Sequence, residues 1–112
     1  MLKVFFILST LSLFTHTAYS DPIYAGKAKV SKIFISVHPT LGPHYQIRTT
    51  PPLGGGCTNP NRVFIDPATN PLAKEMADGL KMAMVADLNV ELILDGCFND
   101  GGKVIQVNLL NE

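Results

Sequence analysis

A single helical pattern interrupts a chain whose other regular segments are all typical of strands. Asn70 is suited to cap a helix, and Pro71 is suited to its first turn. From there, apolar side chains recur three or four positions apart, at Leu72, Met76, Leu80, Ala83 and Met84. We therefore predict one amphipathic helix from Pro71 to Ala86, and its place in the chain limits the folds available to the rest.

The methionines of this segment allow two interpretations. Met76, Met82 and Met84 could form an adaptable or soft-metal binding surface, because the thioether is flexible and polarisable. An apolar stripe with helical spacing more often faces a hydrophobic core, so we expect these side chains to pack inside the protein.

Three strand patterns precede the helix. Residues 25–38 are rich in β-branched side chains, and their apolar positions change parity between Val30 and Ile33, which indicates a β-bulge. Residues 44–50 resume the alternation after a loop and should pair with the first strand as a hairpin. A short third strand, residues 62–65, precedes Asp66 and Pro67.

Two strand patterns follow the helix, at residues 90–94 and 104–109, with a polar turn at residues 99–102 between them. The order of three strands, one helix and two strands is that of the oligonucleotide/oligosaccharide-binding (OB) barrel. We expect a small five-stranded OB-like barrel, of mainly β or α+β class. An open α+β sandwich would satisfy the same order.

The first twenty residues have the pattern of a signal peptide. Lys3 precedes an apolar run from Val4 to Phe14, and small residues stand at Ala18 and Ser20. The run is shorter than the roughly 20 apolar residues that a membrane span needs. We expect cleavage after Ser20, one domain covering residues 21–112, a secreted or periplasmic location and no membrane span.

Both cysteines, Cys57 and Cys97, lie beyond the leader, and an even number of cysteines in an exported protein predicts a disulfide. In the chain-entropy model, closing a loop of about 40 residues contributes about 4 kcal/mol, a large share of a small domain's stability. A redox role would favour a Cys-x-x-Cys pair, and a metal site would need more ligands. We therefore expect a structural disulfide and no cofactor or metal.

Charge and composition favour a binding protein over an enzyme. The formal net charge is +0, and loss of Lys3 with the leader makes it slightly negative, so nothing indicates a nucleic-acid partner. Beyond the leader the hydroxyl and imidazole candidates are Ser31, Ser36, His38 and His44; neither serine lies in a G-x-S-x-G elbow, and the histidines lack a third ligand.

We expect a non-catalytic binding or interaction module for a glycan or a protein. The alternatives are a compact hydrolase with paired carboxylates, which would need a cleft, and a structural subunit of an exported assembly, which would need an exposed apolar patch.

The binding surface of an OB barrel is formed by the loops between strands one and two and between strands four and five, beside the face of strands two and three. The side chains that the sequence places there are His38, His44, Tyr45, Phe98, Asn99 and Asp100. They supply donors, acceptors and rings without strong charge, which suits a neutral glycan or a protein loop. The alternative is that they only serve the turns, which favour Asn, Asp and Gly in any case.

The pattern of Cys57, Phe64-x-Asp66, the helix from Leu72 to Ala86, Val90-x-Leu92 and Gly96-Cys97 resembles uncharacterised small exported bacterial proteins. It is also distantly similar to the B subunits of AB5 toxins of the subtilase-cytotoxin kind, which are five-stranded barrels with one helix. The resemblance covers residues 25–109 and implies a homo-oligomeric ring that binds glycans. It assigns no sugar-binding residue in this sequence.

The exported protein should begin at Asp21 and carry the Cys57–Cys97 bridge, because the leader ends in a peptidase site and the export route is oxidising. Intact-mass spectrometry of the secreted protein tests both features. A different first residue, or a mass two hydrogens above that of the oxidised chain, would contradict them.

Overall fold

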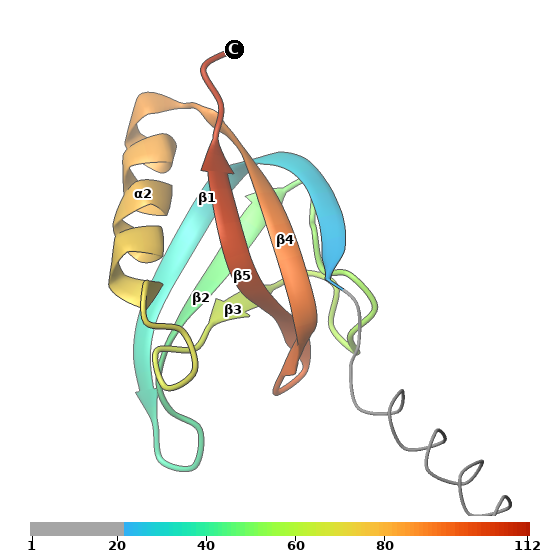
Figure 1. Ribbon diagram of the computed structural model, residues 1–112, viewed down its shortest axis with the longest axis vertical. Helices are drawn as coiled ribbons and strands as arrows, with labels where there is room; N and C mark the ends of the chain where they lie inside the picture. Colours follow the sequence, from blue (N-terminus) through green and yellow to red (C-terminus); the bar gives the residue numbers. More distant parts are fainter. Residues whose placement is uncertain (1–21) are drawn as a thin grey trace, which may run out of the picture.

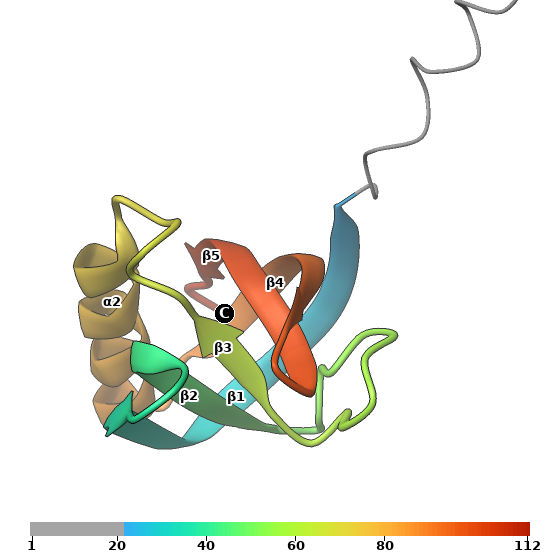
Figure 2. The ribbon, with the colours of Figure 1, turned by 90° about the horizontal axis from the view of Figure 1, so that it is seen from below.

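Five strands close into one barrel, with a helix along its side (Figures 1 and 2). The structure is a computed structural model that describes residues 22–112, so the expected leader and its cleavage point lie outside the described residues. The elements, in chain order, are β1 (Ile23–His38), β2 (Gly42–Thr50), β3 (Val63–Ile65), α2 (Ala73–Ala86), β4 (Asn89–Phe98) and β5 (Gly101–Leu109). This order, with one helix among residues 22–112, confirms the predicted OB-like architecture.

Around the barrel the strands follow the order β1-β2-β3-β5-β4, and β4 returns to β1. Every neighbouring pair is antiparallel except β3 and β5, which run parallel. The parallel contact is short, because only Val63 and Phe64 of β3 pair with Gly102 and Lys103 of β5.

One long strand closes the ring. The first half of β1, to Lys29, pairs with β4, and its second half, from Lys29 to His38, pairs with β2. The register with β2 shifts between Val30 and Lys32, which confirms the predicted bulge. A bulge bends and twists a strand, and the bend lets β1 leave one neighbour and meet the other.

The core consists of side chains that point inward from alternate strand positions. Those with at most 2% of their surface exposed include Ile47 of β2, Val63 of β3, Val90 and Leu92 of β4, and Val104 of β5. Burial of each such side chain contributes about 1.5 to 3 kcal/mol.

The helix packs on this core through part of the predicted stripe and through two further alanines. The buried residues of α2 are Ala73, Ala77, Leu80 and Ala83, and Met76 is partly buried. Leu72, Met82 and Met84 are 53%, 55% and 37% exposed, so the expectation that they belong to the core was wrong. Alanines let the helix approach the barrel closely, and a sequence pattern that gives large apolar side chains more weight than alanine misses such a face.

The helix also begins later than predicted, at Ala73 instead of Pro71. Asn70 forms a turn ahead of it: its side-chain Oδ1 accepts the N–H of Leu72 at 2.9 Å, and its carbonyl accepts the N–H of Ala73 at 3.2 Å. Asn70 therefore supports the first turn from outside the helix, as Asn commonly does.

The predicted disulfide is present, with the two Cα atoms 5.9 Å apart. Cys57 lies in the loop between β2 and β3 and not at the start of β3, so the bridge fastens this loop to the end of β4. Leu53 of the same loop is buried in the core, and Gly54 lies against the backbone of Pro60, where a side chain would clash. The loop is therefore held against the barrel by the disulfide and by side-chain packing, without strand pairing.

The tip of the β1–β2 hairpin reaches past the barrel. Ile35 and Val37 lie on the same face of β1 as partly buried Ile33, yet they are 69% and 78% exposed.

None of the helical structure in residues 22–112 has the length and apolar character needed to cross a membrane.

The stripe on α2 can be tested with a matched pair of variants. Leu80→Ala should lower the free energy of unfolding by about 2 to 5 kcal/mol, because Leu80 is fully buried. Met82→Ala, on the exposed side of the same helix, should change it by less than about 0.5 kcal/mol. Urea unfolding measures both values, and equal losses in the two variants would show that the stripe is misplaced.

Candidate binding cleft

The outer surface of β2 and β3 carries the candidate site. Ile47 and Val63 face the core, so the alternate residues Gln46 and Phe64, which are cross-strand partners, face outward. His44 lies two residues before Gln46 and shares its face. Although it points outward, Phe64 is only 2% exposed, so other side chains cover it.

Two rings cover Phe64, one from each flanking loop region. The ring centroid of Phe64 lies 5.5 Å from that of His44 and 5.2 Å from that of Phe98, and His44 and Phe98 are 5.5 Å apart. Such separations are typical of packed aromatic pairs. The three rings join the start of β2, β3 and the end of β4 into one cluster.

Gly101 allows the turn between β4 and β5 to approach β3 this closely. A Cβ atom at this position would lie 2.6 Å from the carbonyl oxygen of Arg62 and 2.7 Å from the ring of Phe64. Any side chain at residue 101 would therefore push the turn, with Phe98 and Asn99, away from β3.

An ion pair fixes the same turn from the other side. Arg62 donates from Nε to Oδ1 of Asp100 at 3.1 Å and from Nη2 to Oδ2 at 2.6 Å, a bidentate pair. Its Nη1 donates to Oε1 of Gln46 at 3.4 Å, and its guanidinium lies 5.6 Å from the centroid of Phe64. The hydrogen bonds from Arg62 lower the pKa of the Asp100 carboxyl below its ordinary value.

The two histidines of the hairpin have different tautomers in their neutral forms. Nδ1 of His38 accepts the backbone N–H groups of Thr40 at 3.1 Å and Leu41 at 3.3 Å, which places its proton on Nε2. Nδ1 of His44 lies 3.0 Å from the carbonyl oxygen of Gly42, to which it must donate, so its Nε2 is an acceptor. In the neutral rings, Nε2 of His38 is therefore a donor and Nε2 of His44 an acceptor.

Between the hairpin and the β4–β5 turn lies a cleft of about 470 Å³, within the usual range for ligand pockets. The residues that line it are Ser36, Val37, His38, Leu41, His44, Gln46, Arg62, Phe64 and Asn99. Polar side chains form most of this lining, and Val37 and Leu41 provide its apolar part.

The structure brings together five of the six residues expected from the sequence. His38, His44 and Asn99 line the cleft, Phe98 packs on two of its rings, and Asp100 binds Arg62 beside it. Tyr45 does not join them: it faces inward and packs against the core.

Sequence reasoning did not assign Ser36, Gln46, Arg62 or Phe64 to the binding site. Gln46 could have been predicted from the alternation of β2, because residues two apart lie on the same face and Gln46 follows His44 by two positions. Arg62 and Phe64 could be placed only once β3 was known to lie beside the β4–β5 turn.

The arrangement suits hydrogen bonding to a polar ligand. Within residues 22–112, no group of three or more His, Cys, Asp or Glu side chains is placed to hold a metal ion. The backbone holds the rings of His38 and His44, and Arg62 holds the side chain of Gln46. These groups are therefore ordered before a ligand arrives, which lowers the entropic cost of binding.

The Arg62–Asp100 pair should make stability depend on acidic pH. Because the folded-state pKa of Asp100 is lowered, its contribution is complete above the ordinary value of 3.8 and is lost as the pH falls through the folded-state value. Asp100→Asn should therefore cost about 1 kcal/mol at neutral pH, since the pair keeps some solvent contact, and progressively less as the pH falls below 3.8.

The control for this experiment is Asp87→Asn, which makes the same change in an ion pair with Lys29 whose carboxylate is 82% exposed. Asp87 has φ of 59°, a conformation that Asn tolerates. Urea unfolding of both variants at several pH values should show a pH-dependent loss only for Asp100→Asn. A loss for Asp100→Asn that stays the same size as the pH falls through the acidic range would refute the assigned role.

Comparison with known proteins finds no matching family model, no matching curated protein and no matching solved structure. The resemblance to toxin B subunits thus stays a prediction from the sequence. What can be said of function comes from the cleft itself.

Proposed function

We propose that this protein is an exported, non-catalytic binding module that holds a glycan in the cleft between the β1–β2 hairpin and the β4–β5 turn. The observation that carries the proposal is the convergence of Ser36, His38, His44, Gln46 and Asn99 on one cleft of about 470 Å³. These side chains come from two strands, β1 and β2, and from the β4–β5 turn, and they meet where OB barrels bind their ligands.

A glycan fits the chemistry of the lining. Sugars present hydroxyl groups at their edges and C–H groups on their faces. The cleft offers hydroxyl, amide and imidazole groups for the former, and apolar Val37 and Leu41 for the latter. The resemblance to toxin B subunits favours the same class of ligand.

The hydrolase alternative receives less support from this site. A general acid in glycoside hydrolysis needs a carboxyl whose pKa is raised, with a second carboxyl facing it across the substrate. Asp100, which flanks the cleft, is bound on both oxygens by Arg62, and its pKa is lowered. That carboxylate is therefore suited to hold the turn and not to donate a proton.

Export is supported by two independent features. The first twenty residues have the charge, length and terminal small residues of a signal peptide. The Cys57–Cys97 bridge joins two segments that are both exposed at least in part, and such bridges persist in oxidising compartments.

The glycan proposal is tested by a double variant of the lining, Ser36→Ala with Asn99→Gly. Glycine suits position 99 because Asn99 has φ of 55°, which alanine would disfavour. On a glycan array, the secreted wild-type protein should retain a saccharide that the double variant binds at least about tenfold more weakly, a loss that corresponds to about one good hydrogen bond.

The control is Gln106→Ala with Asn108→Ala, which removes two polar side chains from β5, where they bond to each other and Asn108 to Glu91. This protein should keep wild-type affinity. Equal retention by the cleft variant, or capture only of a protein and no saccharide, would overturn the glycan assignment.

A further inference from the structure

Two cations stand directly opposite each other next to the cleft. Lys32 of β1 and Arg48 of β2 are cross-strand partners on the outer face, and both are exposed. Both also lie over the same ring: Nζ of Lys32 is 5.3 Å, and Cζ of Arg48 5.6 Å, from the centroid of Phe34. Like charges at opposing positions destabilise a sheet, so this pairing is a cost to the fold.

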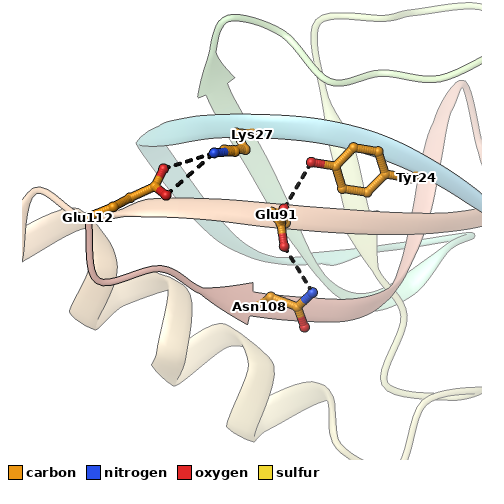
Figure 3. A network of polar contacts seen from close by, with 5 residues as sticks. All are labelled: Tyr24, Lys27, Glu91, Asn108 and Glu112. Atoms are coloured by element: carbon orange, nitrogen blue, oxygen red, sulfur yellow. Dashed lines mark hydrogen bonds and ion pairs between the residues drawn. The ribbon is translucent and has the colours of Figure 1, made fainter.

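The other lysines of β1 are neutralised. Lys27 pairs with Glu112 at 3.1 Å, beside the network of Tyr24, Glu91 and Asn108 (Figure 3). Lys29 pairs with Asp87 at 3.0 Å. Among residues 22–112, no carboxylate lies within ion-pair distance of Lys32 or Arg48.

We propose that Lys32 and Arg48, held over Phe34, bind the acidic group of the saccharide that occupies the cleft. This inference rests on the proposed function and names its ligand class: a glycan that carries a carboxylate or a sulfate. Arg48 offers a planar fork that matches either group, and Lys32 adds a second charge from the opposite strand.

The cation pair and the cleft form one continuous surface. Phe34 is the cross-strand partner of Gln46, which lines the cleft, and Arg48 follows Gln46 on the same face of β2. Two residues along a strand span about 7 Å. A saccharide of more than one unit can therefore fill the cleft and present its acidic group to the cations.

A nucleic acid is a poorer fit to the same surface. Single strands are bound by several open aromatic faces and a long basic groove. Here Phe64 is 2% exposed, Phe34 is covered by the two cations, and Arg62 is neutralised by Asp100. Two unpaired cations match one acidic group better than a row of phosphates.

The inference can be tested with the secreted protein and three saccharide probes of equal length. A heparin hexasaccharide carries sulfates and carboxylates, an oligogalacturonate hexamer carries carboxylates alone, and chitohexaose is neutral. We expect at least one acidic probe to bind about tenfold more tightly than the neutral probe at low salt, and this preference to fall in 0.5 M NaCl.

The variants Lys32→Gln and Arg48→Gln should each weaken the acidic probe about threefold to tenfold and leave the neutral probe within about twofold. Lys27→Gln makes the same change of net charge on the same strand, but at a lysine already paired with Glu112. It should leave both affinities within about twofold.

The outcomes separate this inference from the proposed function. Loss of neutral and acidic binding in the Ser36→Ala, Asn99→Gly protein, with no effect of Lys32→Gln or Arg48→Gln, would keep the glycan cleft and overturn the acidic ligand. Equal effects of Lys27→Gln and Lys32→Gln would also overturn it. A 20-nucleotide single strand that binds more tightly than every saccharide, through the same two cations, would replace the ligand class.

Discussion

The change of partner along β1 is the constraint on which the rest of the structure depends. One strand pairs with β4 in its first half and β2 in its second, and the bulge between Val30 and Lys32 supplies the bend that this requires. Without it, β1 would continue along one neighbour and the ring could not close. Closure buries one face of every strand and leaves the outer faces for other chemistry.

The cleft follows from a second close approach. β3 and β5 pair over only two residues, so the β4–β5 turn is held against β3 mainly by side chains. Gly101 has no side chain to keep the turn away from β3, and the bidentate Arg62–Asp100 pair fixes the orientation of the turn. The rings of Phe64, Phe98 and His44 pack between the two segments. The same groups that fasten the turn therefore shape one wall of the site.

Element order, the bulge and the disulfide could be predicted because each has a local signal: periodicity, a change of parity and a count of cysteines. The buried face of α2 could be predicted only in part. Leu80 and Ala83 are buried as expected, but the apolar pattern gave more weight to exposed Leu72 and Met84 than to buried Ala73 and Ala77. The loop residues His38, His44, Phe98, Asn99 and Asp100 were found through the fold. Tyr45 was misplaced because adjacent residues of a strand face opposite sides.

The net charge of the sequence does not describe the local charge around Lys32 and Arg48. A formal net charge of +0 argues against a polyanion partner, but it describes only the average over the sequence. The fold, however, gives Lys27 and Lys29 carboxylate partners and leaves Lys32 beside Arg48 with none. A single acidic group interacts with the charges within about 10 Å and not with the net charge of the protein, because salt screens the more distant charges. Local recognition of an anion and overall neutrality are therefore compatible, and only the pairing of β1 with β2 brings the two cations together.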